Sequence, residues 1–166
     1  MADNGITIRP IDFPRDEAGL KSFLVERDQQ RLDHSEVAVR DGHCFILVAE
    51  QEGRPVGWVV VHTTFRDDQD WSPPDDDTRR FQTGENAYVE NIEVTAGIRG
   101  NGVGARLLEA AQDEAKQRGK LTLWLHTSEN NTKAHKLFDR EGWVQESSVY
   151  PPWRPNARMR IYRKTL

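Results

Sequence analysis

The stretch that decides the fold is Arg99-Gly100-Asn101-Gly102-Val103-Gly104, which stands between a predicted strand at 87–94 and a predicted amphipathic helix. Glycines let the backbone approach a phosphate closely, and the free N–H groups at a helix N-terminus carry partial positive charge. Arg99 adds a formal charge. The stretch therefore predicts a phosphate-binding loop, and a glycine-rich turn that binds nothing is the alternative.

Two familiar phosphate loops can be compared with this stretch. A Walker loop needs Lys and Ser or Thr after its glycines, but Ala105-Arg106 follow here, so nucleotide hydrolysis is excluded. Gly100-x-Gly102-x-x-Ala105 matches the relaxed dinucleotide fingerprint. However, the next predicted strand ends in His126-Thr127 and lacks the acid that binds the ribose. A dinucleotide-dependent enzyme is therefore a weakly supported hypothesis.

Working outward from the loop, hydrophobic periodicity predicts the other elements. The predicted strands are 6–12, 43–51, 56–65, 87–94, 121–127, 143–150 and 157–165. Helices are predicted from Pro14 to Leu32, at 35–41, after the glycine loop as far as Gly119, and at 131–142. The three-residue step from Val89 to Ile92 indicates a β-bulge. This order predicts a mixed α/β sheet in one domain, residues 1–166.

Composition excludes several classes of protein. The chain has 166 residues, one cysteine and a formal net charge of −4, and no apolar run approaches the roughly 20 residues of a membrane span. We expect no nucleic-acid partner, no membrane partner and a cytoplasmic location. The whole net charge lies in residues 66–85, which hold seven acids and three arginines and are predicted to be a loop too polar to pack.

Two blocks of the chain resemble the GCN5-related N-acetyltransferase (GNAT) family. Val94-x-x-x-x-Arg99-x-x-Gly102-x-Gly104 is similar to the family's acetyl-coenzyme A signature. The block from Leu125 to Trp143, with Asn131-x-x-Ala134-x-x-Leu137-Phe138 and Gly142-Trp143, is similar to a second family block. The resemblance covers residues 87–145 closely and residues 6–65 only in the order of elements.

The resemblance implies an acyl-CoA N-acyltransferase fold, in which a mostly antiparallel sheet is flanked by helices and a central strand pair is splayed apart. Acetyl-CoA would be the cofactor, with its pyrophosphate on the backbone N–H groups of Arg99, Gly100, Asn101, Gly102, Val103 and Gly104. A main-chain N–H in the region of Ile92, Glu93 and Val94 would polarise the thioester carbonyl. Asn131 would contact the pantetheine arm or order the helix start.

Acetyl transfer to an amine requires proton transfers, and three residues are candidates for the base. Glu90 and Glu93 lie on the strand beside the implied thioester site, and His126 titrates near neutral pH. We rank Glu90 first, because it precedes Ile92 by two positions on that strand. Phe138, a candidate contact of acetyl-CoA, stands in the second family block at a position where the family often has a tyrosine acid, and it has no proton to donate.

The acceptor implied is a primary amine, and the acidic segment favours a cationic small molecule such as a polyamine, an aminoglycoside-like compound or an amino acid. Candidate acceptor contacts are Asp70, Trp71, Tyr88 and Trp153. A protein N-terminus or lysine is an alternative acceptor, and a non-catalytic acyl-CoA sensor is an alternative function. A C-terminal edge strand could form a homodimer. The sequence contains no spacing typical of a metal site.

Overall fold

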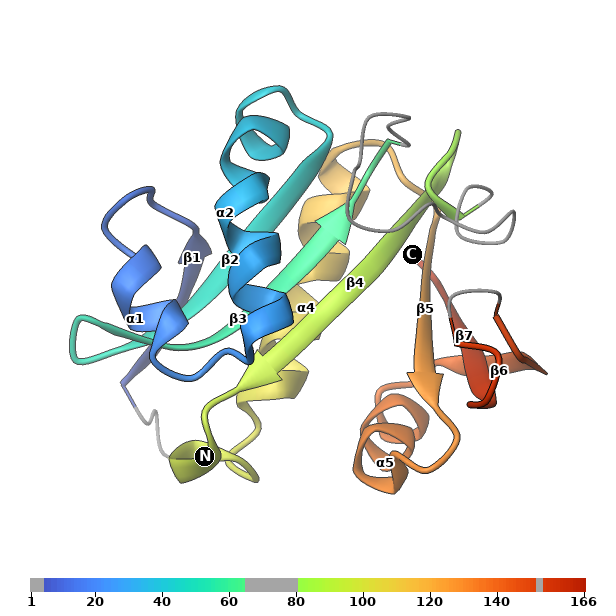
Figure 1. The fold of residues 1–166 in the computed structure, drawn as a ribbon. Helices are drawn as coiled ribbons and strands as arrows, with labels where there is room; N and C mark the ends of the chain where they lie inside the picture. Colours follow the sequence, from blue (N-terminus) through green and yellow to red (C-terminus); the bar gives the residue numbers. More distant parts are fainter. Residues whose placement is uncertain (1–4, 65–80, 152–153) are drawn as a thin grey trace. The chain divides into compact units, whose positions relative to one another are not determined.

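The structure is a computed structural model that describes residues 5–64, 81–151 and 154–166 (Figure 1). Its helices and strands, with the 3-10 helix η1, follow one another as β1 (Ile6–Pro10), α1 (Glu17–Lys21), α2 (Glu26–Arg40), β2 (Cys44–Gln51), β3 (Arg54–His62), β4 (Asn86–Val94), η1 (Ala96–Ile98), α4 (Val103–Gln117), β5 (Thr122–Ser128), α5 (Thr132–Arg140), β6 (Val144–Val149) and β7 (Met159–Thr165). No helix among these residues is long and apolar enough to cross a membrane.

The strands form a seven-stranded sheet in the order β1-β2-β3-β4-β5-β7-β6. β4 and β5 are parallel, whereas β1 pairs antiparallel with β2, and β7 pairs antiparallel with both β5 and β6. Residues 86–88 of β4 pair with residues 122–124 of β5, and the described ladder between these two strands ends there. β5 instead pairs with β7 along its full length. The predicted mixed, mostly antiparallel sheet with a splayed central pair is confirmed.

Contacts divide the described residues into two compact units. Unit 1 comprises those in Met1–Val61 and Asn91–Ala111, and unit 2 comprises those in His62–Glu90 and Gln112–Leu166. The division falls within β4 and within α4. That residues 1–166 form one domain stays a prediction.

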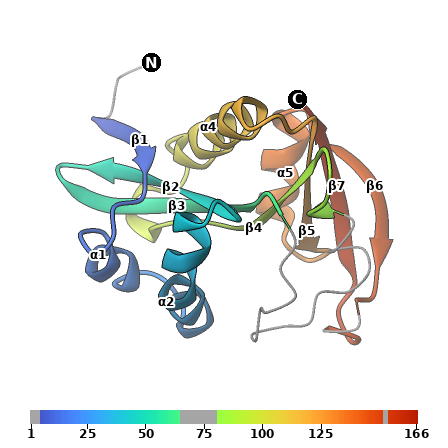
Figure 2. The same ribbon diagram turned by 90° about the horizontal axis from the view of Figure 1, so that it is seen from above.

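An apolar core lies in unit 1 between α1, α2 and the strands β2 and β3. Trp58 and Val60 of β3 contribute to it together with Ile46 and Val48 of β2, because residues two apart on a strand point to the same face. Figure 2 shows α1 and α2 on one face of these strands and the start of α4 on the other. Both faces are therefore covered, and residues 57–61 of β3 are all buried instead of alternating.

Gly57 on β3 sets how closely α4 approaches in unit 1. A Cβ atom at this position would lie 3.1 Å from the carbonyl oxygen of Glu93 and 3.2 Å from Cδ1 of Leu107. The absent side chain thus brings β3 close both to β4, which carries candidate site residues, and to the first turns of α4.

The core of unit 2 has a layer on each face of β5 and β7. On one face Leu123 and Leu125 are buried, and the rings of Phe138 on α5 and Tyr162 on β7 lie 5.2 Å apart between centroids. On the other face, a second cluster consists of Phe81, Tyr88 and Ile161, with Trp124 and Val149 packed against it.

Two predictions of local structure are wrong. The first is the helix from Pro14 to Leu32, because the chain breaks between α1 and α2: Val25 is extended, with ψ of 158°. The Gln29 side chain stabilises the break, since its Nε2 donates to the carbonyls of Lys21 and Leu24 at 3.1 and 2.8 Å. The separate helix predicted at 35–41 is also not found: these residues are the C-terminal part of α2, which ends at Arg40.

The second wrong prediction concerns residues 66–85, which were expected to be too polar to pack. Phe81 is fully buried and Gln82 is 3% exposed. Phe81 is buried in spite of its polar neighbours in the sequence, because burial of a large aromatic ring removes extensive apolar surface from water. The residues before position 81 in this segment lie outside the described part.

Candidate active site

The glycine loop has the backbone that its sequence predicts. It follows η1 in unit 1, and α4 begins at Val103. Gly100 and Gly102 have φ of +88° and +79°, a region that favours glycine strongly. A Cβ at either position would meet no atom within 4 Å, so the loop borders open space. The glycines are therefore required by the backbone turn and leave the start of α4 accessible.

Arg99 is held against the end of β4. Its Nε donates to the carbonyl oxygen of Val94 at 2.8 Å, and its guanidinium forms an ion pair with Glu93. The Arg99 side chain remains 57% exposed. Glu93, a candidate base, is thus engaged with the predicted phosphate-binding arginine. Asn101 and Val103 also line a cavity of about 320 Å³ together with Ile6, Gln51 and Ile98.

Glu90 in unit 2 forms a buried ion-pair contact with a residue that the sequence did not single out. Its Oε2 meets Nε2 of His62, the last residue of β3. The two side chains are only 10% and 5% exposed. A hydrogen bond between a carboxylate and an imidazole is strengthened by such burial, because little water competes for it. The arrangement can hold a carboxylate in a fixed orientation and pass a proton.

Tyr88 and His126 form a second proton-carrying pair in unit 2. The Tyr88 hydroxyl and Nδ1 of His126 lie 3.1 Å apart. Phe81 covers both, with ring centroids 6.5 Å from Tyr88 and 5.7 Å from His126, and it stacks on Trp124 at 4.4 Å. Because Tyr88 and Glu90 are two apart on β4, they point to the same face of the strand.

The remaining candidates from the second block have structural contacts. Asn131 caps α5, since its Oδ1 accepts from the backbone N–H of Ala134 at 3.2 Å, which matches the expected role at the helix start. Phe138 is 3% exposed and packs against Trp143 and Tyr162. Ile92 and Val94 are half-buried on β4 in unit 1.

Three predicted acceptor contacts, Asp70, Trp71 and Trp153, lie outside the described residues. The described residues contain no group of three His, Cys, Asp or Glu side chains arranged to hold a metal ion. Sequence reasoning missed His62. His62 could have been noticed as the first ionisable residue after the apolar run Val59-Val60-Val61, where a buried charge needs a partner.

Comparison with known proteins identifies the family to which the chain belongs. The profile of the acetyltransferase (GNAT) family matches residues 6–143, which is most of the chain. The chain therefore belongs to the GNAT family of acetyltransferases.

Individual relatives agree with this family. The uncharacterized N-acetyltransferase YhfO of Bacillus subtilis is 30% identical over 103 residues, covering 61% of this chain and 60% of that protein. Streptothricin acetyltransferase of Streptomyces lavendulae is 40% identical over 56 residues, covering 34% and 30%. The [ribosomal protein bS18]-alanine N-acetyltransferase of Haemophilus ducreyi is 34% identical over 70 residues, covering 40% and 48%. The chain thus spans 60% or less of the length of these relatives.

Solved structures share the fold. A ribosomal-protein-alanine N-acetyltransferase from Brucella melitensis superposes with a TM-score of 0.69 at 23% identity, covering 96% of this chain and 99% of that one. The structure of yncA from Salmonella typhimurium, solved with its cofactor acetyl-CoA, gives 0.68 at 20% identity, covering 98% and 95%. At these identities the likeness shows the fold alone.

Proposed function

We propose that this chain is an acetyl-CoA-dependent N-acetyltransferase that acetylates a primary amine by direct attack of the amine on the thioester. The observation that carries the proposal is the start of α4, where two glycines with positive φ leave the helix N-terminus open in a chain of the GNAT family. A cytoplasmic location and a homodimer remain predictions.

The residues at the glycine loop fit the diphosphate of acetyl-CoA. The first backbone N–H groups of a helix have no carbonyl partner within it, and at the start of α4 the Arg106 N–H donates to the Gly102 carbonyl at 3.1 Å. The N–H groups of Val103, Gly104 and Ala105 therefore have no partner within the helix and can donate to phosphate oxygens, and the helix dipole favours negative charge there. When bound, acetyl-CoA supplies the acetyl group as a thioester.

We assign the base to Glu90. A cationic amine must lose a proton before its nitrogen can attack, and Glu90 offers a buried carboxylate oriented by His62. Glu93 is a weaker candidate, because its carboxylate is already paired with Arg99. His62 touches Glu90 and is assigned as a positioning residue.

We assign protonation of the leaving sulfur to the Tyr88–His126 pair. Phe138 cannot donate a proton, whereas the Tyr88 hydroxyl carries one and is hydrogen-bonded to an imidazole that can replace it. The amine nitrogen loses two protons as it becomes an amide: the first passes to Glu90 and from there to solvent, and the second, lost after attack, replaces the proton that the Tyr88–His126 pair gives to the sulfur. His126 thus acts beside the acid in this proposal, and its sequence-based role as the base is the alternative.

The acceptor we propose is a cationic small-molecule amine, supported by the acidic residues concentrated in 66–85. A protein N-terminus is the second candidate, because one relative is named for acetylating the alanine of ribosomal protein bS18. A lysine side chain belongs to the same alternative. A sensor that binds acyl-CoA without transfer is distinguished by the absence of thiol release.

The loop is tested by replacing Gly102 with Glu and measuring acetyl-CoA binding by calorimetry. The new carboxylate would repel the diphosphate, and we expect at least a hundredfold loss of affinity. Gly53→Glu is the matched control, because Gly53 has φ of +77° and open space around its Cβ, like Gly102. Both variants carry similar backbone strain and the same charge. Equal affinities in the two variants would show that the loop does not bind the cofactor.

Catalysis is tested by thiol release from acetyl-CoA in the presence of amines of different classes, together with an N-terminal peptide beginning with alanine. Release above the uncatalysed rate with any acceptor rejects the sensor. A preference for the peptide rejects the small-molecule acceptor and supports the protein alternative.

A further inference from the structure

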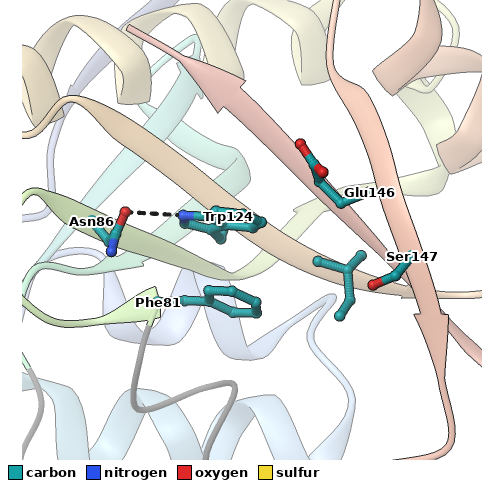
Figure 3. A pocket seen from close by; sticks show the side chains of 6 residues that line it. Phe81, Asn86, Trp124, Glu146 and Ser147 are labelled. Carbon is teal, nitrogen blue, oxygen red and sulfur yellow. Dashed lines mark hydrogen bonds between the residues drawn. The ribbon is translucent and has the colours of Figure 1, made fainter.

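We propose that a cavity in unit 2 binds the body of the acceptor amine and that this body is an aromatic or flat apolar ring. The cavity has a volume of about 440 Å³ and is lined by Phe81, Asn86, Trp124, Glu146, Ser147 and Ile161 (Figure 3). Its size is in the range of small-molecule sites. The proposal rests on the acetyltransferase function and names the class of substrate.

The floor of the cavity is aromatic and rigid. The rings of Phe81 and Trp124 stack with centroids 4.4 Å apart and planes inclined by 9°. Trp124 is further fixed by its Nε1, which donates to Oδ1 of Asn86 at 3.1 Å. Ile161, 2% exposed, adds an aliphatic wall. A flat ring can lie against Trp124, which is only partly buried, and aromatic pairs gain beyond simple burial.

A β-bulge in β6 places two polar residues in the wall of the cavity. Gln145 of β6 pairs with Tyr162 and Ser147 pairs with Ile161, so Glu146 is an extra residue without a partner in the register. Consecutive strand residues normally point to opposite faces, but a bulge re-aims one of them. Both Glu146 and Ser147 consequently line the cavity.

The charges around the cavity favour a ring over a polyamine. Glu146 is the acid among the lining residues, and its Oε1 already accepts from Nε of Arg163 at 2.5 Å. The Arg163 guanidinium also lies 6.0 Å from the centre of the Trp124 ring. The lining is therefore close to neutral. An extended cation with several ammonium groups would find no surplus of carboxylates among the described residues of this wall.

The cavity adjoins the proton-carrying residues of unit 2. Trp124 precedes His126 by two positions on β5, so both side chains point to the same face, and the Phe81 ring lies 5.7 Å from the His126 ring. A ring held against Trp124 would end before the Tyr88–His126 pair, so a chain has to join the ring to the amine. An amine separated from its ring by one or two methylenes matches this placement.

The test compares kcat/KM for phenethylamine, n-propylamine and spermidine by thiol release from acetyl-CoA. Burial of a phenyl ring predicts that phenethylamine exceeds n-propylamine by about tenfold to a hundredfold. It should exceed spermidine as well. If kcat/KM for spermidine or for n-propylamine exceeds that for phenethylamine, the ring proposal is overturned, while the acetyltransferase function stands. No thiol release with any amine or peptide overturns the function itself.

A cavity-filling variant links the preference to this site. Ser147 is exposed, so Ser147→Phe is expected to fold and to occupy the space that the substrate ring needs. The ratio of kcat/KM for phenethylamine to that for n-propylamine should fall at least tenfold. Gln145→Phe is the control, because Gln145 is exposed on the same strand and does not line the cavity. An unchanged ratio in a folded Ser147→Phe variant, checked by circular dichroism, overturns the proposal.

Discussion

Replacing Glu90 with Gln removes the proposed base and keeps the size of the side chain. Its carboxyl group is about nine-tenths buried, so bulk water has little access to substitute for it. A positioned general base contributes about 10²- to 10⁴-fold to rate. We therefore expect kcat/KM to fall by at least about a hundredfold, which corresponds to about 3 kcal/mol of transition-state stabilisation.

His62→Gln separates positioning from catalysis. This variant leaves the Glu90 carboxylate in place but removes the imidazole that contacts it. A hydrogen bond to a charged group contributes about 1.5–3 kcal/mol, so a decrease of about tenfold to a hundredfold is expected. A carboxylate that loses a donor holds its proton more tightly. The acid limb of the pH–rate profile should therefore move to higher pH, a change that a purely structural defect would not produce.

The assay is steady-state thiol release between about pH 5.5 and 9.5 with a saturating amine. Glu93→Gln is measured in parallel, because Glu93 lies on the same strand and its ion pair with Arg99 places it outside the proposed chemistry. The reasoning is refuted if Glu90→Gln keeps the wild-type rate and pH profile. A larger loss in Glu93→Gln would transfer the role of base to Glu93.

Two further predictions concern stability. Asp16 is buried and accepts from both Nη atoms of Arg9 at 2.7 Å, so Asp16→Asn should lower the free energy of unfolding by about 3 kcal/mol in urea titrations at pH 7. Burial alone would raise the pKa of Asp16, but hydrogen bonds from Arg9 and the Asp12 N–H, with Coulomb attraction, leave it lowered. This stabilisation is complete above the ordinary carboxyl pKa and is lost as the pH falls through the lower pKa of the folded state. The difference in unfolding free energy between wild type and Asp16→Asn should therefore shrink in acid. A difference that does not depend on pH would contradict the assignment. Asn131→Ala should cost about 1 kcal/mol by removing the cap of α5, and an unchanged unfolding curve with weakened acetyl-CoA binding would instead support a contact with the pantetheine arm.

The sequence predicted best those parts of the fold whose cause is local. The glycine loop was predictable because Gly100 and Gly102 adopt φ values that other residues rarely adopt. The strands were predictable from alternating apolar residues, as in β5, or from continuous apolar runs, as in β2 and β3. The break between α1 and α2 was not, because it depends on Gln29 reaching back to carbonyls of the preceding helix. A side-chain bond of this kind leaves no periodic signal.

Only part of the candidate site could be predicted, because its contacts join residues that are far apart in the sequence. Glu90 was identified from its place on β4, but its partner His62 ends another strand, 28 residues earlier. Their contact depends on tertiary structure that a single sequence does not reveal. Phe81 was placed in a polar segment by composition, whereas the structure buries its ring against Trp124. Local polarity was a poor guide at this position, because composition does not show which single side chain is buried.

The alternation along β5 separates the proposed acceptor wall from the most deeply buried side chains of the same strand. Leu123 and Leu125 are buried on the face packed toward the core, while Trp124 and His126, on the opposite face, are only partly buried. In the proposed site, a substitution at Trp124 changes the wall that meets the acceptor ring, while Leu123 and Leu125 on the other face stay unchanged. A library of variants at Trp124, which is only partly buried, should therefore retain more folded members than a library at the buried Leu123 and Leu125.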